Sequence, residues 1–186
     1  MITNELLKRP AIRLHGKVDD IMLNNFLEQM NNVLDNQGPV LVEVTTTGGD
    51  AETGRRIATD IIIARERFGL DFIFLGKSVV YSAGISIMSG FKRERRFLTK
   101  DCMLLVHERR LDKKLELKGA MRGMRPLVMD VLAEIESAVK MERTAFEYLV
   151  EGSDISLDEL MARIGESDWY IPSAEAVQKR LVAGVL

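Results

Sequence analysis

Ser82 is a candidate nucleophile, because other residues of this sequence could activate its hydroxyl. A serine hydroxyl attacks a carbonyl carbon only when a base lies within hydrogen-bond reach and a third group fixes the tautomer of that base. The chain contains two histidines, His15 and His107. His107 follows the apolar segment 103–106, and the end of a strand projects a side chain from a rigid element into a cleft. This pattern favours acyl transfer with Ser82 as nucleophile and His107 as base.

Backbone N–H groups near Ser82 could stabilise a tetrahedral oxyanion. Ala83 and Gly84 follow Ser82 at the expected start of a helix, where free N–H groups and a partial positive charge are available. Gly48 and Gly49 offer a second set of donors with no side chain in the way. Donors of this kind stabilise the negative charge that develops on the carbonyl oxygen during acyl transfer.

Each of these features also has a purely structural interpretation. Ser-Ala-Gly is a common tripeptide, and a lone histidine such as His107 is more often a structural residue. Gly48-Gly49 before a helix fits a simple turn or a phosphate-binding helix N-terminus. Asp168, which stands before the last expected helix, fits a capping residue. The chemistry therefore depends on whether the fold brings these residues together.

Strands and helices alternate along the first part of the chain. Apolar β-branched runs predict strands, and apolar residues at helical spacing predict helices. The expected strands are 11–14, 40–44, 71–75, 96–98 and 103–106, with a turn of small residues over 76–84. The expected helices are 21–34, which Asp19-Asp20 can cap, 51–64, which Asp50 can cap, and 85–91. This order indicates an α/β fold with a largely parallel sheet. Since ligands bind beyond the carboxyl ends of parallel strands, Gly48-Gly49, Ser82 and His107 should face one crevice.

The second part of the chain is mainly helical. An apolar stripe over residues 118–150 predicts one long helix, or two helices broken near Pro126. Ser156 with Glu159 three residues later predicts a capped short helix, and a last helix is expected near Ser173. The helix over 118–150 is longer than one small sheet needs for cover. Its stripe is therefore a candidate surface for packing against a neighbouring copy.

Composition narrows the classes of function. The 186 residues are 46% apolar and 29% charged with a net charge of −2, which predicts one globular domain over residues 1–186 with no affinity for nucleic acid. No signal peptide or membrane span is expected, and the basic group 92–96 is interpreted as a solvated turn. Cys102 is the single cysteine and has apolar neighbours, so we expect a buried, inert thiol in a cytoplasmic protein. We expect neither a cofactor nor a metal.

Taken in order, these segments resemble the proteolytic subunit of the ATP-dependent Clp protease over nearly the whole chain. Residues 13–20 resemble the first strand and turn of that family, and Gly48-Gly49 resembles its glycine motif. Residues 81–84, Tyr-Ser-Ala-Gly, are similar to the nucleophile motif Ala-Ser-Met-Gly. Residues 103–107 resemble the strand that ends in the catalytic histidine, and 168–177 resemble the segment that carries the catalytic aspartate.

This resemblance implies an α/β fold of the ClpP and crotonase type, built from repeated β-β-α units with a handle-type helical segment over about 118–150. It implies a serine endopeptidase in which Ser82 attacks the peptide carbonyl, His107 transfers the proton and Asp168 orients His107. The N–H groups of Gly49 and Ala83 would form the oxyanion hole. The implied substrates are peptides or unfolded proteins. The implied partners are further copies of the chain, in a single or double heptameric ring, and an AAA+ unfoldase.

Several positions depart from the family pattern. Thr46-Thr47 stands where the family has Ser-Pro, and Glu108-Arg109 stands where it has Gln-Pro. The charged segment 110–118 replaces a glycine-rich stretch, and Arg180 stands where a glycine is usual. The interval between the histidine and the aspartate is also longer than the family suggests. These changes leave open the form of the oligomer and the docking of an unfoldase.

Three alternatives remain. Crotonase-like enzymes share this fold and hold the enolate of an acyl-thioester with glycine-rich backbone donors. Here Gly48-Gly49 would serve, with Asp50 or Glu52 as acid or base. A Clp-like subunit with a misaligned triad would have a role in assembly alone. Finally, Lys77 lies close enough in sequence to Ser82 for a Ser-Lys dyad, which a well-placed His107 makes unnecessary.

Overall fold

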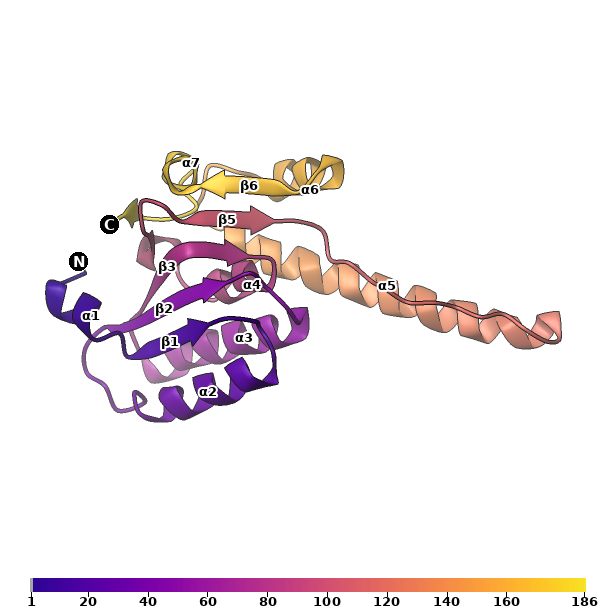
Figure 1. Ribbon diagram of the computed structural model, residues 1–186, viewed down its shortest axis with the longest axis horizontal. Helices are drawn as coiled ribbons and strands as arrows, with labels where there is room; N and C mark the ends of the chain where they lie inside the picture. Colours follow the sequence, from indigo (N-terminus) through magenta and orange to yellow (C-terminus); the bar gives the residue numbers. More distant parts are fainter. Residues whose placement is uncertain (1) are drawn as a thin grey trace.

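The computed structural model describes residues 2–186 and has the predicted α/β architecture with a largely parallel sheet (Figure 1). Five strands lie side by side in parallel pairs, in the order β1 (Ile12–His15), β2 (Val40–Thr46), β3 (Phe72–Tyr81), β4 (Arg96–Leu98) and β7 (Gly184–Val185). A second branch leaves β3, and consists of β5 (Met103–Val106), which is parallel to β3, and β6 (Trp169–Pro172), which is antiparallel to β5. The sequence did not predict β6 or β7.

Helices cover the sheet and one of them leaves it. They are α1 (Asn4–Lys8), α2 (Asp20–Asn31), α3 (Ala51–Phe68), α4 (Ala83–Ser89), the 3₁₀ turn η1 (Arg93–Arg95), α5 (Met121–Val150), α6 (Leu157–Glu166) and α7 (Ser173–Gln178). The expected N-caps are present, because the side chains of Asp19, Asp50 and Ser156 accept hydrogen bonds from the first turns of α2, α3 and α6. Helix α2 ends at Asn31, so the prediction that it extends to Leu34 was wrong.

Strand β2 is buried on both faces, as its run of apolar residues predicted. Val40, Val42 and Val44 belong to the main core beneath the helices. Leu41 faces the other way and packs with residues of β3 and β4 under the short helix α1. The sheet is therefore a central layer, and its carboxyl ends are the exposed edge at which a site can form.

Strand β3 continues to Tyr81, so the prediction of a turn over 76–84 was wrong. The small residues mark a bulge instead, at which the β2–β3 register shifts and Ser78 adopts a positive φ of 56°. Thr45 Oγ1 donates a hydrogen bond to Lys77 O (3.0 Å) at this point. Before the bulge β3 pairs with β4, and after it β3 pairs with β5. Because of the bulge, the end of β3 lies beside β5, and Ser82 follows directly after it.

Helices α3 and α4 pack closely at Gly54. A Cβ atom at Gly54 would lie 2.6 Å from the backbone oxygen of Ala83, which follows Ser82. We expect Gly54→Ala to lower the free energy of unfolding by about 1–2 kcal/mol, because overpacking outweighs the gain of about 1 kcal/mol in helix propensity. Gly38→Ala is the matched control, since nothing lies within 4 Å of its added Cβ. Urea unfolding checks the difference, and equal stability of the two variants would contradict the packing argument.

The basic group 92–96 is a turn, but Arg96 is not solvated, so that part of the interpretation was wrong. Arg96 is 1% exposed and its guanidinium donates to the carbonyl oxygens of Phe91, Tyr148 and Leu149. Burial lowers the pKa of Arg96 to about 10, which leaves it protonated at neutral pH. Tyr148 and Leu149 lie in the last turn of α5, where carbonyl groups lack helical partners. Arg96 therefore ties the end of α5 to the sheet.

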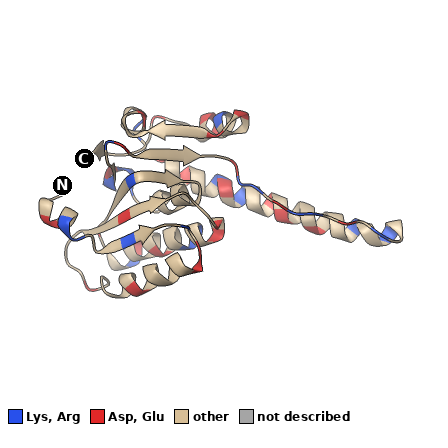
Figure 2. Ribbon diagram, in the orientation of Figure 1, with Lys and Arg blue, Asp and Glu red and all other residues tan. Residues whose placement is uncertain are grey.

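Helix α5 is one continuous helix of 30 residues with Pro126 in its second turn, so the alternative of a break there does not occur. It projects far beyond the sheet, and the extended segment 107–120 runs outward along it from the end of β5 to the tip (Figure 1). Charged residues of both signs lie along this arm (Figure 2). Apolar side chains are also exposed on it, namely Leu127, Val128, Met129, Leu132, Ile135 and Val139. Within residues 2–186, no helix combines the length and the apolar character that crossing a bilayer requires.

Candidate active site

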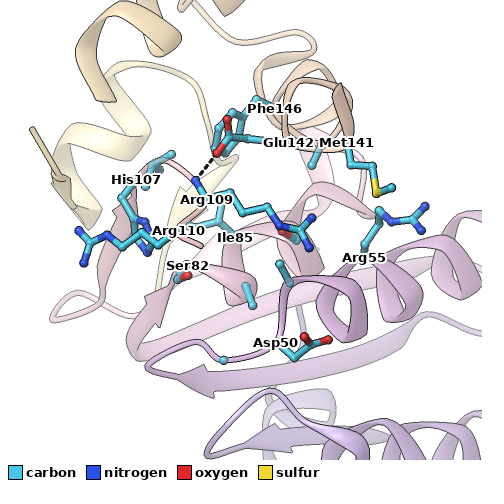
Figure 3. Close-up of a pocket in the computed structure, with 16 residues that line it drawn as sticks. Asp50, Arg55, Ser82, Ile85, His107, Arg109, Arg110, Met141, Glu142 and Phe146 are labelled. Carbon is cyan, nitrogen blue, oxygen red and sulfur yellow. Dashed lines mark hydrogen bonds between the residues drawn. The ribbon is translucent and has the colours of Figure 1, made fainter. Parts of the chain in front are cut away.

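A cavity of about 270 Å³ opens at the carboxyl ends of β3 and β5 (Figure 3). Gly49, Ser82, Ala83 and His107 all line it. Its far wall comes from α5, whose residues Met141, Glu142 and Phe146 face Ser82 across the opening. Four of the five residues that the sequence analysis singled out for catalysis or oxyanion binding thus share one cavity.

Ser82 occupies a sharp turn between β3 and α4. Its backbone has φ 55° and ψ −114°, a conformation that L-residues rarely adopt and that costs about 1–3 kcal/mol. The Ser82 N–H donates to Leu105 O (2.9 Å), which fixes the turn against β5. The Ser82 side chain makes no capping hydrogen bond to α4, so its Oγ remains available at the cavity. A strained strand-to-helix turn is one known way to expose a nucleophilic serine.

The glycine turn after β2 fits closely around Ser82. Gly48 has φ 98°, and a Cβ there would lie 2.8 Å from Ser82 Cβ and 3.0 Å from Tyr81 O. Both the conformation and the space therefore require glycine. Buried Thr46 shapes the turn, because its Oγ1 accepts a hydrogen bond from Gly48 N (3.0 Å). This contact gives a structural role to one of the departures from the family pattern.

Two backbone donors border the cavity. Gly49 is held by its pairing with Val18, in which Val18 N–H donates to Gly48 O (3.0 Å) and Asp50 N–H donates to Val18 O (2.8 Å). The N–H groups of Gly49 and Ala83 donate to no other backbone group among residues 2–186. Ala83 is the first residue of α4, where N–H groups have no intrahelical partner. These two groups are therefore free to bind an oxyanion.

His107 follows β5 directly and lies close to Ser82 (Figure 3). Its Nδ1 is 2.5 Å from Glu108 O. A carbonyl oxygen only accepts, so Nδ1 is the donor in this contact, and in the neutral imidazole Nε2 is then the acceptor, which is the tautomer a base needs. In the part of the chain that the structure describes, Ser82 and His107 form no direct hydrogen bond. Such contacts in unliganded sites are often long and tighten when substrate binds.

Asp168 lies opposite His107 but does not contact it. Strands β5 and β6 are antiparallel and their last pair is Val106 with Trp169, so His107 and Asp168 occupy the next facing positions. The Asp168 carboxylate instead accepts two hydrogen bonds from Arg110 Nη2, each 2.8 Å. Asp168 is not among the residues that line the cavity. The fold therefore sets the aspartate beside the histidine, while its carboxylate is bound to another residue.

Sequence reasoning missed the contacts of the segment that follows His107. Arg109 N–H donates to the carboxylate of Glu142 on α5, and the Arg109 guanidinium donates to Glu52 on α3 (2.7 Å). Burial raises the pKa of Glu142 above its ordinary value. The sequence showed that this segment is charged, but its partners are distant in sequence and follow no fixed spacing. The signal that was available is the pair of arginines two and three residues after the candidate base.

Asp50 and Glu52, the acidic residues of the crotonase-like alternative, both make hydrogen bonds to other groups of the chain. The backbone N–H of Thr53 holds the pKa of Asp50 below its ordinary value, since Asp50 caps α3. Burial raises the pKa of Glu52, but the hydrogen bonds from Arg109 and Arg55 outweigh it and leave a lowered pKa. Both carboxylates are thus ionised and committed to other groups, which does not suit an acid that must hold and donate a proton.

Lys77 is engaged as well, which weakens the Ser-Lys alternative. Its Nζ lies 2.5 Å from one oxygen of Glu43, and His15 Nε2 lies 3.0 Å from the other. Lys77 does not line the cavity at Ser82. Burial raises the pKa of Glu43, but the hydrogen bonds and charges of Lys77 and His15 hold it below its ordinary value. The Lys77 side chain is therefore paired with a carboxylate outside the cavity.

Comparison with known proteins gives one consistent result. A family model described as Clp protease matches residues 1–186. The ATP-dependent Clp protease proteolytic subunit of Lactococcus lactis subsp. cremoris is 24% identical over 95% of this chain and 83% of the relative. The corresponding subunit of Streptococcus sanguinis is 25% identical over 95% of this chain and 84% of the relative. In fold, the chain is similar to a ClpP1 mutant from Listeria monocytogenes, with a TM-score of 0.76, 16% identity, and coverage of 100% of this chain and 96% of that one.

Proposed function

The chain belongs to the Clp protease family, and from this premise we propose that it is a serine endopeptidase that uses Ser82, His107 and Asp168. The observation that carries the proposal is the shared cavity. Ser82 on a strained turn, His107 with its Nδ1 donating to Glu108 O, and two free backbone donors border the same space. Nucleophile, base and oxyanion donors are the parts that peptide hydrolysis requires.

The proposed reaction has two halves. Ser82 Oγ attacks the peptide carbonyl carbon while His107 Nε2 takes the hydroxyl proton, and the oxyanion is bound by the N–H groups of Gly49 and Ala83. His107 then gives that proton to the leaving amine, and an acyl-enzyme remains. Water repeats the sequence: His107 removes its proton, the ester is cleaved, and Ser82 regains its hydrogen. Asp168 acts by holding the imidazolium, which requires it to exchange its Arg110 contact for His107 Nδ1.

The substrate proposed is a peptide or unfolded protein. The relatives are named as subunits of an ATP-dependent protease. The class of partner to test is therefore an AAA+ unfoldase, by measuring whether ATP and such a partner allow degradation of a folded substrate.

Incubation of the purified chain with an unfolded protein and, separately, with an acyl-thioester tests the proposal. We expect short peptides to accumulate, and a fluorophosphonate to block their release. Thioester turnover without peptide release would favour the crotonase-like alternative. A stable oligomer that acts on neither substrate would favour a role in assembly alone.

We further propose that the chain forms homo-oligomers through its arm, which is α5 together with residues 107–120. Several apolar side chains of α5 are about half exposed there, and Val128 and Leu132 lie one turn apart on one face. We expect Val128→Glu with Leu132→Glu to shift the chain to smaller species in analytical ultracentrifugation, with helicity unchanged by circular dichroism. Asp130→Asn is the control, because Asp130 is exposed on the same helix. An unchanged sedimentation profile would contradict the assignment of the arm.

A further inference from the structure

We propose that residues 108–110 hold His107 and Asp168 apart in the resting subunit, and that Arg110 is the residue that withholds Asp168. The inference rests on the proposed function, because it concerns the same serine, histidine and aspartate. It assigns a regulatory role to a segment that departs from the family pattern.

The 108–110 segment supplies hydrogen-bond partners to both His107 and Asp168, which in a working triad would bond to each other. His107 Nδ1 donates to the carbonyl oxygen of Glu108. Both oxygens of Asp168 accept from Arg110, at 2.8 Å each. A working triad instead needs Nδ1–H to donate to the aspartate, so that the imidazolium formed during attack is stabilised. Each half of that contact is already used by the intervening segment.

The strand register shows that only a local movement separates the two arrangements. Val106 and Trp169 are the last pair of the β5–β6 ladder, and His107 and Asp168 stand at the next facing positions. Directly opposed residues of an antiparallel pair have neighbouring Cβ atoms. Displacement of the 108–110 segment would therefore leave the carboxylate and the imidazole within reach of each other without any change in the sheet.

Contacts from two helices fix the segment in its place. Arg109 N–H is bound by Glu142 of α5, and the Arg109 guanidinium is bound by Glu52 of α3. Arg110 also lines the cavity of Ser82, so a substrate entering that cavity meets the segment directly (Figure 3). Glu142, which restrains the segment, and Arg109 and Arg110 of the segment itself thus border the space where a substrate would displace it.

The contact between Arg110 and Asp168 is weak enough to be reversed. The Arg110 side chain is 71% exposed and that of Asp168 is 36% exposed. Ion pairs with this exposure are screened by water, and a single nitrogen, Arg110 Nη2, makes both contacts, so the pair lacks the two parallel N–H···O bonds of a bidentate arginine–carboxylate pair. Its removal should therefore raise the population of the competent arrangement by about two- to five-fold rather than by orders of magnitude.

The test compares Arg110→Gln with Lys114→Gln, a control in the same extended segment whose ion pair with Glu116 lies outside the cavity. The readouts are the rate at which a fluorophosphonate labels Ser82 and the kcat for a short fluorogenic peptide. We expect Arg110→Gln to raise both by about two- to five-fold with little change in KM, and Lys114→Gln to change neither. An equal or lower rate in Arg110→Gln would overturn the inference.

A second pair of variants tests whether the gain acts through Asp168. In an Asp168→Asn background, Arg110→Gln should give no further acceleration of labelling, because no carboxylate is left to release. The same gain in both backgrounds would show that Arg110 acts only by obstructing the cavity, and would overturn the assignment. The Ser82→Ala variant distinguishes failure of the proposed function from failure of this inference. Labelling that persists in Ser82→Ala refutes the proposed function. Labelling that depends on Ser82 but is not accelerated by Arg110→Gln refutes this inference alone.

Discussion

Replacement of His107 by alanine is expected to lower kcat/KM for peptide hydrolysis by about three orders of magnitude or more. Among the residues that the structure describes, His107 is the only histidine that lines the cavity at Ser82, and donation from its Nδ1 to Glu108 O makes Nε2 of the neutral ring the nitrogen that can accept a proton. A serine hydroxyl without a base is a poor nucleophile at neutral pH. Loss of the imidazole should therefore leave only the contribution of the oxyanion donors and of substrate binding.

Lys77→Met is the matched variant for this experiment, since it removes the other candidate base. Lys77 is bound to Glu43 outside the cavity, so we expect Lys77→Met to keep most of the activity. Steady-state kinetics with a fluorogenic peptide provide the measurement, and circular dichroism shows whether each variant is folded. Full activity in His107→Ala together with its loss in Lys77→Met would reverse the assignment in favour of a Ser-Lys dyad.

Replacement of Arg96 by methionine is expected to lower the free energy of unfolding by about 3 kcal/mol, and Tm by about 10 °C. The guanidinium is 1% exposed and supplies hydrogen bonds to four carbonyl oxygens, of Phe91, Tyr148, Leu149 and Leu181. Methionine fills much of the same space but donates nothing. The buried carbonyl groups would lose their partners, and each unsatisfied group costs about 1 kcal/mol or more.

Arg95→Met serves as the control for Arg96→Met. Arg95 precedes Arg96 in sequence and pairs with Asp71, with 36% and 40% of the two side chains exposed. An exposed pair of this kind contributes about 0–1 kcal/mol, so Arg95→Met should change Tm by no more than a few degrees. Thermal unfolding followed by circular dichroism gives both values. If the two variants were destabilised equally, Arg96 would not be the residue that ties α5 to the sheet.

Local patterns predicted most of the elements that build the sheet. Strand β2, the helices α2 and α3, and the caps at Asp19, Asp50 and Ser156 follow from periodicity and from side chains that accept N–H groups. Strand β3 was cut short in the prediction because small residues resemble a turn. In the structure the same residues form a bulge, which neighbouring strands keep paired on both sides. Pairing between strands thus overrode the local signal.

Long-range contacts were beyond the reach of these patterns. Arg96 stands in a row of charges that predicts a solvated turn, but the end of α5, distant in sequence, supplies the carbonyl groups that bury it. Arg180, where the family has glycine, has φ 55° and an ion pair with Asp154 (3.1 Å), which the sequence alone did not suggest. Burial of a charge depends on partners that no local spacing specifies.

The candidate site was predictable to the extent that it depends on parallel strands. Ser82 and His107 follow the adjacent strands β3 and β5, so their placement at one edge of the sheet follows from strand order alone. Asp168 depends on the antiparallel strand β6, which was not predicted. Its contact with Arg110 depends on the course of an irregular segment. The sequence could therefore predict where the backbone and the strand ends lie, but it could not predict which side chains pair at the site.

The most direct measurement of the central claim is the location of a covalent fluorophosphonate adduct, found by intact mass and then by peptide mapping. We predict one adduct per chain, attached to Ser82 Oγ, and no adduct in Ser82→Ala despite a native circular dichroism spectrum. An adduct on another residue, labelling that persists in Ser82→Ala, or a native chain that stays unlabelled would contradict the account.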